Sequence, residues 1–242
     1  MAETHYLSTK PIPTDERLIL ALDVADAVDA KALVEELGDA VRFYKVGLEL
    51  FMTGGAFELV EWLHRRGRRT FLDLKFFDVP QTVGSAVRQL ARWEASFATV
   101  HGNDAILRAA VGAKGDTKIL AVTMLTSLDD GDLRDLGFQA DVGAVVLSRA
   151  RRALELGCDG VISSGLEAPR LRAELGERLL VVTPGIRPVA NVDDQKRTVD
   201  VEEAFLGGAD HIVVGRPIRV AADPRAAAVA VQERIARLFG GG

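Results

Sequence analysis

Short apolar segments alternate with longer amphipathic segments along the chain from about residue 18 onward. Eight of the short segments are rich in Val, Ile and Leu. They are mostly continuous rather than alternating, as expected for parallel strands that are covered on both faces. We therefore predict buried strands at residues 18–24, 42–46, 70–75, 97–101, 118–123, 160–163, 179–183 and 211–214.

The segments between these strands have the apolar spacing that one face of a helix requires. We predict helices at residues 27–37, 56–66, 82–93, 104–112, 142–156, 169–175, 201–207 and 224–239, with an extra short turn at 129–137. Residue types that cap helices stand at several of their ends. These are Asp26, Asp141 and Asp223 before a helix, and Gly38, Gly67 and Gly157 after one.

Strict alternation of strands and helices predicts an α/β protein with a parallel sheet. Eight such units in 242 residues favour closure into a single (β/α)8 TIM barrel, which typically takes about 250 residues. We expect residues 18–242 to form this one catalytic domain and residues 1–17 to be an N-terminal leader outside the core. The alternative is an open doubly wound sheet, but residues 22–26 are not the glycine-rich loop that usually follows its first strand.

Composition and charge limit the possible binding partners and indicate the cellular compartment. A net charge of −5 and a pI near 5.5 do not suit broad electrostatic binding to nucleic acid, although they allow a local basic pocket for phosphate. Cys158 is the single cysteine, so no intrachain disulfide can form and a reducing compartment is expected. We see neither a signal peptide nor an apolar run of about 18 residues, and expect a cytoplasmic protein that does not contact membranes.

Charged residues gather where the second and third predicted strands end, which in a barrel is the side of the active site. Asp73 and Lys75 are two residues apart on a strand, so both should point into the barrel. Lys45 ends the neighbouring strand and faces the same space, and Asp78 follows just after the third strand. Because buried charges are costly unless paired, a set of this size indicates catalysis rather than a structural network.

A second group of residues suits a phosphate. Barrels often bind phosphate with the loops after strands seven and eight. Arg187 and Arg216 lie in those loops, and a guanidinium offers several donors to phosphate oxygens. Gly215 precedes Arg216 and lets a backbone N–H approach a ligand closely.

Short motifs follow one another in a fixed order: Ala-Leu-Asp at 21–23, Lys-Val-Gly at 45–47, Asp-x-Lys-x-x-Asp at 73–78, Val-Thr-Met-Leu-Thr-Ser at 122–127, Val-Thr-Pro-Gly-Ile-Arg-Pro at 182–188, Asp-Gln at 194–195 and Gly-Arg-Pro-Ile at 215–218. Across residues 18–240 this ordered set resembles the orotidine 5′-phosphate decarboxylase family. The chain departs from the family pattern at Phe77, where relatives often have His, and at residues 101–104, which replace a glycine-rich stretch.

The resemblance implies a carboxy-lyase that converts orotidine 5′-monophosphate to uridine 5′-monophosphate in de novo pyrimidine nucleotide biosynthesis. The Lys75 ammonium would stabilise a carbanion at C6 and then donate the proton, with Asp73 and Asp78 favouring its charged form. Lys45 would balance Asp73 and contact the ribose.

The same resemblance assigns further substrate contacts: Asp23 to the ribose hydroxyls, Thr126 to the pyrimidine edge, and Gln195 to both the phosphate and the pyrimidine. Family members are homodimers, and the residues matching Asp78 and Thr82 reach into the partner's site. The sequence therefore implies a homodimer that binds a nucleotide.

No cofactor is expected, and no His-x-x-x-His pair indicates a zinc site. Two other functions stay open. Barrel enzymes that act on phosphorylated ketoses share Asp-x-Lys-x-x-Asp but use Mg²⁺, and they place an acid where this chain has Lys45. A non-catalytic nucleotide-binding module would not need the Asp–Lys–Asp array. Residues 189–194 and 127–137 are the candidate loops for closing over the site.

Overall fold

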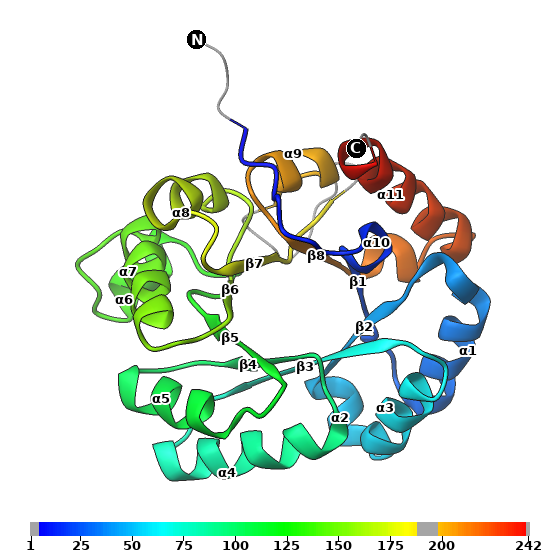
Figure 1. Ribbon diagram of the computed structural model, residues 1–242, viewed down its shortest axis with the longest axis horizontal. Helices are drawn as coiled ribbons and strands as arrows, with labels where there is room; N and C mark the ends of the chain where they lie inside the picture. The colour runs from blue at the N-terminus through cyan, green and yellow to red at the C-terminus, as the bar shows by residue number, and fades with distance from the viewer. Residues whose placement is uncertain (1–4, 188–197, 241–242) are drawn as a thin grey trace.

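The computed structural model describes residues 5–187 and 198–240. Its centre is a closed barrel of parallel strands in chain order (Figure 1). The strands are β1 (Leu18–Ala21), β2 (Phe43–Gly47), β3 (Arg69–Phe76), β4 (Phe97–Val100), β5 (Lys118–Val122), β6 (Gly160–Ile162), β7 (Leu180–Thr183) and β8 (His211–Val214). The predicted (β/α)8 barrel is confirmed, and the open doubly wound sheet is excluded.

Helices surround the barrel: α1 (Ala27–Leu37), α2 (Leu48–Thr53), α3 (Ala56–His64), α4 (Pro80–Leu90), α5 (Asp104–Ala113), α6 (Asp130–Asp135), α7 (Val142–Glu155), α8 (Ala168–Leu175), α9 (Val201–Leu206), α10 (Arg216–Arg219) and α11 (Pro224–Phe239), with 3-10 turns at Thr14–Glu16, Gly38–Ala40 and Ala91–Trp93. Asp26, Asp141 and Asp223 accept hydrogen bonds from the first backbone N–H groups of α1, α7 and α11, so these predicted N-caps are confirmed. The sequence did not predict α2 and α10, because six and four residues are too few to show helical periodicity.

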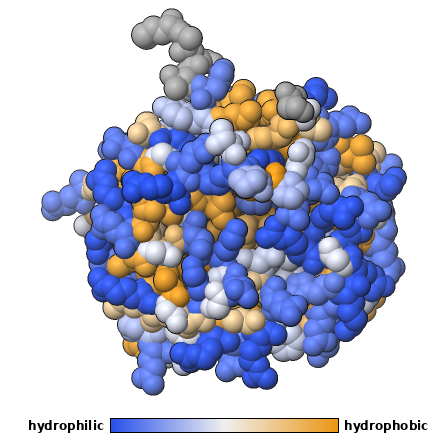
Figure 2. Space-filling view, viewed as in Figure 1, coloured by the Kyte–Doolittle hydropathy of each residue, from blue (hydrophilic) through white to orange (hydrophobic). Residues whose placement is uncertain are grey.

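Apolar side chains pack in two layers. The inner layer fills the barrel and consists of Ile19, Ala21, Phe43, Phe71, Phe97, Leu120, Val122, Ile162, Leu180, Val182 and Val213. Ring centroids of Phe43 and Phe71 lie 5.0 and 6.0 Å from that of Phe97. The outer layer joins the other faces of the strands to the helices. The face shown in Figure 2 is covered mainly by hydrophilic side chains, with smaller apolar areas between them.

The segment before β1 is attached to the amino end of the barrel. Its backbone N–H at Tyr6 donates to the carbonyl of Leu206 at 2.8 Å. Ser8 and Arg17 within it are buried, and the Ser8 hydroxyl donates to Asp210, which directly precedes β8. The domain boundary at residue 17 stays a prediction. No helix of the described residues is long and apolar enough to cross a membrane.

Candidate active site

A cavity of about 800 Å³ opens where the strands end. Polar side chains from six of the strands, or from the segments that follow them, line it: Asp23, Lys45, Asp73, Lys75, Thr126, Arg187, Arg216 and Arg219, with Glu49 from α2. Apolar side chains of the inner layer line it too: Phe71, Val122, Ile162 and Val213. The volume lies within the range of about 300–1,000 Å³ that small-molecule sites occupy.

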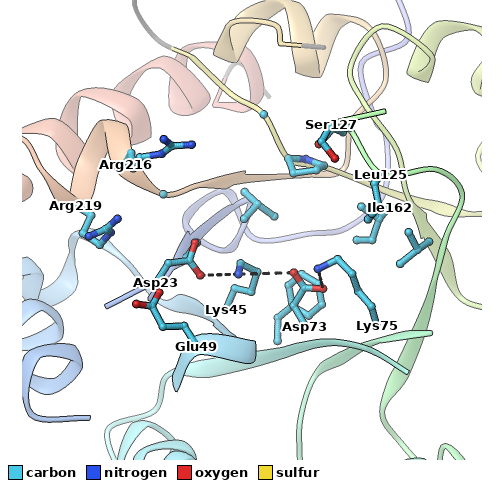
Figure 3. A pocket seen from close by; sticks show the side chains of 18 of the residues that line it. Asp23, Lys45, Glu49, Asp73, Lys75, Leu125, Ser127, Ile162, Arg216 and Arg219 are labelled. Carbon is cyan, nitrogen blue, oxygen red and sulfur yellow. Dashed lines mark hydrogen bonds and ion pairs between the residues drawn. The ribbon is translucent and has the colours of Figure 1, made fainter. Parts of the chain in front are cut away.

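Four charged side chains of alternating sign form a row along this cavity, in the order Asp23, Lys45, Asp73, Lys75 (Figure 3). The Lys45 ammonium lies 2.9 Å from Asp23 and 3.7 Å from Asp73. The Lys75 ammonium lies 2.9 Å from Asp73. Gly47 leaves room for this row, because a Cβ at that position would lie 3.1 Å from Nζ of Lys45.

Asp73 stands at the centre of the row, and its side chain is 13% exposed. Burial opposes its ionisation, but the charges of Lys45 and Lys75 and the hydroxyl of Thr99 overcome that penalty and hold the pKa of Asp73 below its ordinary value. The Lys75 side chain is 35% exposed, so its ammonium is paired on one side and open to the cavity on the other. A ligand in the cavity therefore meets a fixed positive charge.

Strand β3 is irregular where it carries these groups. Lys75 has a φ of 46°, in the left-handed region that residues other than glycine rarely adopt. The pairing of β3 with β4 shifts register between Leu72 and Phe76. Asp73 and Lys75 do share the cavity, as predicted. The prediction assumed that side chains alternate regularly along β3, whereas the strand is irregular at these residues.

The predicted phosphate ligands lie on the same cavity. In Figure 3, Arg216 and Arg219 stand at the Asp23 end of the row and Lys75 at the opposite end. Gly215 is the N-cap of α10, and Arg216 and Arg219 are the first and last residues of that helix. Arg187 follows β7 and also lines the cavity. The structure thus brings the loops after β7 and β8 together with the charged row.

Two predicted residues lie outside this cavity. Asp78 is exposed, and its carboxylate accepts a hydrogen bond from the backbone N–H of Val79 at 2.6 Å. Thr82 is exposed on α4. Asp78 therefore does not flank Lys75 within one chain, because it follows the strand in the loop that leads away to α4. Gln195 and residues 189–194 lie outside the described part of the chain.

The structure adds residues that the sequence argument missed. Thr99 on β4 contacts both Asp73 and the backbone of Lys75. Arg219 and Glu49 line the cavity from α10 and α2. A threonine inside an apolar strand carries no signal of a polar contact, and both helices were unexpected. Only the spacing of Arg216 and Arg219 by three residues, which places them on one helix face, could have linked Arg219 to the site.

The fold and the charged row define a class, that of (β/α)8-barrel enzymes whose reacting groups stand at the carboxyl ends of the strands. Within this class the chain belongs to the orotidine 5′-phosphate decarboxylase / HUMPS family, whose sequence model matches residues 16–231. This confirms the resemblance drawn from the motifs.

Individual relatives agree with the family match. The chain is 64% identical over 240 residues to the orotidine 5′-phosphate decarboxylase of Methylococcus capsulatus, covering 98% of this chain and 99% of that one. It is 49% identical over 235 residues to the protein of the same name from Stenotrophomonas maltophilia, covering 95% and 98%. The crystal structure of orotidine 5′-phosphate decarboxylase from Lactobacillus acidophilus superposes with a TM-score of 0.81 at 36% identity, covering 91% and 99%.

Proposed function

We propose that this chain decarboxylates orotidine 5′-monophosphate to uridine 5′-monophosphate, a step of de novo pyrimidine nucleotide biosynthesis. One observation carries the proposal: the Lys75 ammonium is held on Asp73 in a cavity that also receives Arg187 and Arg216. A fixed ammonium suits a carbon that becomes negative, and arginines suit a phosphate. Membership of the family and the 64% identical relative support the same reaction.

The reaction breaks the bond between C6 of orotate and its carboxylate, and the electron pair stays on C6. The Lys75 ammonium stabilises this pair and then donates its proton to C6, giving uridine 5′-monophosphate and CO₂. The neutral amine regains a proton from solvent. Accelerations of up to about 10¹⁷-fold require the barrier to fall by about 23 kcal/mol, and preorganised charge in a site that excludes water is the largest contribution available.

Asp73 has two effects in this scheme. Its negative charge beside Lys75 favours the ammonium form that donates the proton. It also faces the carboxylate of the bound substrate, and the repulsion between two negative groups disfavours the ground state until CO₂ has left.

Other cavity residues hold the nucleotide, together with Gln195, which lies outside the described part of the chain. Arg187, Arg216 and the backbone N–H of Gly215 bind the phosphate, whose binding energy is used to stabilise the transition state at the other end of the substrate. Substrate contacts elsewhere are assigned to Asp23 and Lys45 for the ribose, Thr126 for the pyrimidine edge, and Gln195 for the link between pyrimidine and phosphate.

A spectrophotometric assay with orotidine 5′-monophosphate, run with and without EDTA, tests the proposal. We expect the same rate of absorbance change in both. Activity that disappears with EDTA would indicate a metal-dependent enzyme instead. Tight nucleotide binding without any absorbance change would indicate a binding module, and either result overturns the proposal.

We assign Asp78 and Thr82 to the site of a second chain in a homodimer. Both are exposed and outside the cavity of their own chain, and Phe77 and Val79 beside them expose 70% and 62% of their surfaces. Large apolar side chains exposed on both sides of Asp78 support a surface that a partner covers.

Mixing two inactive variants tests this arrangement. Lys75→Ala and Asp78→Ala are each expected to be inactive alone. In a mixed dimer one site combines an intact Lys75 with an intact Asp78 from the partner, so an equimolar mixture should regain about a quarter of wild-type activity if chains redistribute at random. A mixture that exchanges chains, as shown by native mass spectrometry, yet stays inactive would contradict the shared site.

A further inference from the structure

Thr99 lies on β4, beside the irregular part of β3, and no step of the proposed reaction uses it. Its side chain is fully buried. Its hydroxyl accepts a hydrogen bond from the backbone N–H of Lys75 at 2.9 Å and donates one to Oδ1 of Asp73 at 2.8 Å. A hydroxyl has a single proton, so this arrangement gives Thr99 one fixed direction: it accepts from Lys75 and donates to Asp73.

The first of these hydrogen bonds acts on the backbone of Lys75. The φ of 46° at this residue is unfavourable for a side chain with a Cβ, and such conformations persist only where the surroundings hold them. Because the β3–β4 pairing is interrupted between Leu72 and Phe76, the N–H of Lys75 donates to the Thr99 side chain instead of continuing the strand ladder. Thr99 thus fixes the backbone from which the ammonium extends.

The second hydrogen bond acts on the carboxylate. Oδ1 of Asp73 accepts from both the Lys75 ammonium at 2.9 Å and the Thr99 hydroxyl at 2.8 Å. The Lys45 ammonium is farther away, 3.7 Å from Oδ2. Once Lys75 has given its proton to C6, it no longer attracts Asp73 as a cation, whereas the hydrogen bond from Thr99 remains. Thr99 therefore keeps the carboxylate in place when its strongest neighbour has lost its charge.

We propose that Thr99 is a positioning residue, which holds the Lys75 backbone and the Asp73 carboxylate in the geometry needed for proton transfer. This inference rests on the proposed function. Its chemical basis is that a single buried hydroxyl joins the two groups whose relative position decides the reaction. A displacement of about 1 Å at such a site can lower the rate about 10²-fold.

The variants Thr99→Val and Thr99→Ser test the proposal. Valine keeps the shape and removes both hydrogen bonds, whereas serine keeps them. We expect Thr99→Val to lower kcat about 10²-fold with little change in KM, and Thr99→Ser to stay close to wild type. Thr70→Val is the matched control, because Thr70 is a fully buried threonine on β3 whose hydroxyl contacts His64, away from the cavity.

The pH profile separates positioning from a general loss of structure. The charged groups that face Asp73 are Lys45 on β2 and Lys75 on β3, with Asp23 beyond Lys45, and none of them changes in Thr99→Val. The hydrogen bond from Thr99 helps to hold the pKa of Asp73 low, so its loss raises that pKa. The acid limb of the kcat profile should therefore move to higher pH in Thr99→Val and not in Thr99→Ser.

The outcomes distinguish this inference from the proposed function. An inactive wild-type protein refutes the proposed function itself. An active wild type with an equally active, folded Thr99→Val variant refutes the role of Thr99 alone, and so does an unchanged acid limb. If circular dichroism shows that Thr99→Val does not fold, the same measurements are made on Thr99→Ala, which removes the hydroxyl without placing a methyl against Asp73.

Discussion

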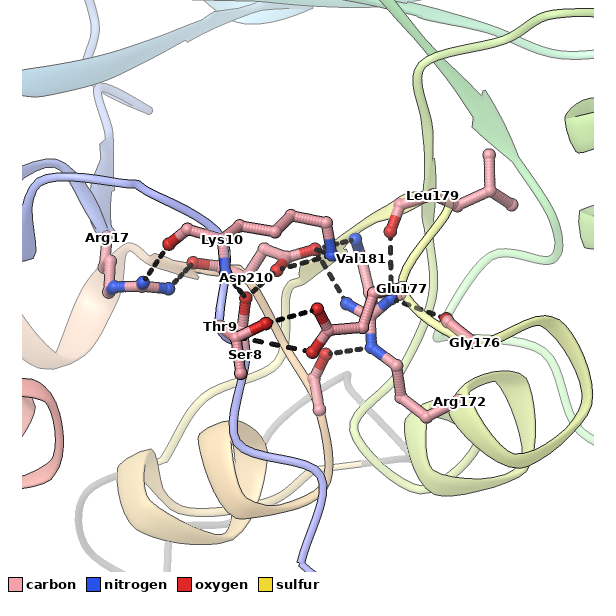
Figure 4. Close-up of polar contacts among 11 residues, drawn as sticks. Ser8, Thr9, Lys10, Arg17, Arg172, Gly176, Glu177, Leu179, Val181 and Asp210 are labelled. Atoms are coloured by element: carbon pink, nitrogen blue, oxygen red, sulfur yellow. Dashed lines mark hydrogen bonds and ion pairs between the residues drawn. The ribbon is translucent and has the colours of Figure 1, made fainter.

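Both ends of the barrel hold networks of charged side chains, but the two networks differ in whether all their charges have partners inside the protein. At the amino end, Asp210 is completely buried. Figure 4 shows the polar contacts around it. Its carboxylate lies 3.1 Å from the Lys10 ammonium and 2.7 Å from the Arg172 guanidinium. The Ser8 hydroxyl and the backbone N–H of Val181 donate to it as well, at 2.5 and 2.9 Å.

Arg172 is equally well satisfied. Its guanidinium donates to the carbonyls of Gly208 and Leu179 at 2.8 and 2.9 Å, besides its bond to Asp210. Burial disfavours the charged form of Asp210, but Arg172, Ser8 and Lys10 overcome this penalty and keep its pKa below the ordinary value. The network fastens the segment before β1 to the base of the barrel, and its charges have their partners inside the protein.

At the carboxyl end, by contrast, the charges of the row are paired along one direction and face a cavity along the other. The difference shows that a buried array of acids and bases does not by itself mark an active site. In an array whose donors and acceptors all have internal partners, each group is needed to satisfy the others, and removing one is destabilising. An array that leaves a cation facing an open cavity can bind a ligand or stabilise a developing charge.

The largest expected effect is the loss of activity in Lys75→Ala. Removing the ammonium takes away both the charge that stabilises the C6 carbanion and the proton donor, so kcat should fall by at least about 10⁴-fold. Asp73 keeps Lys45 and Thr99 as partners, so the protein should remain folded. Turnover of orotidine 5′-monophosphate and urea unfolding measure the two effects. Normal activity in a folded Lys75→Ala variant would disprove the assignment of the reacting group.

The opposite pattern is expected for Arg172→Met at the amino end. This change leaves the buried Asp210 without its closest cation, and breaking a buried ion pair in this way costs about 3–5 kcal/mol of stability. The kcat at a temperature where the variant is folded should be unchanged, because Arg172 is remote from the cavity. Arg151→Met is the control, since its partner Glu174 is 3.4 Å away on the surface and such pairs contribute about 0–1 kcal/mol. Equal destabilisation by Arg172→Met and Arg151→Met would show that the buried network at the amino end matters no more for stability than a surface ion pair.

Most of the fold could be predicted from the sequence because each element carries its own local signal. Mostly continuous apolar runs marked the strands of the described residues, and aspartates marked the starts of α1, α7 and α11. The network around Asp210 could not be predicted, since Ser8 and Lys10 meet it only across about 200 residues of chain. Local patterns along the sequence say nothing about contacts between residues so far apart.

Part of the candidate site could be predicted because the carboxyl ends of all the strands of a barrel lie at the same end of it. That rule alone brings together Asp23, Lys45, Asp73 and Lys75, whichever way the backbone bends. It could not reveal the left-handed φ of Lys75 or the register shift beside it, because both depend on contacts between neighbouring strands. The role of Thr99 could not be predicted either, because it depends on contacts between β3 and β4.

The smallest of the expected effects is a change in how stability depends on pH, and it arises at the amino end of the barrel. His211 follows Asp210 at the start of β8, and burial lowers its pKa from 6.5 to about 4. Its Nδ1 lies 3.0 Å from the carbonyl of Glu16, and its ring packs against those of Phe43 and Phe97. The folded protein therefore holds this imidazole neutral at pH values where the unfolded chain protonates it.

Between pH 6.5 and about 4, the unfolded state binds the proton and the folded state does not, so stability falls as the pH is lowered through this window. Since one pKa unit corresponds to about 1.4 kcal/mol, His211 should account for a loss of about 3 kcal/mol. Urea unfolding of His211→Asn should show a shallower decline over this window than wild type, even if the variant is less stable throughout. His5→Asn, which changes an exposed histidine, should follow the wild-type slope. Parallel wild-type and His211→Asn curves would mean that the imidazole is protonated in the folded protein, and that this end of the barrel is less closed than its hydrogen bonds indicate.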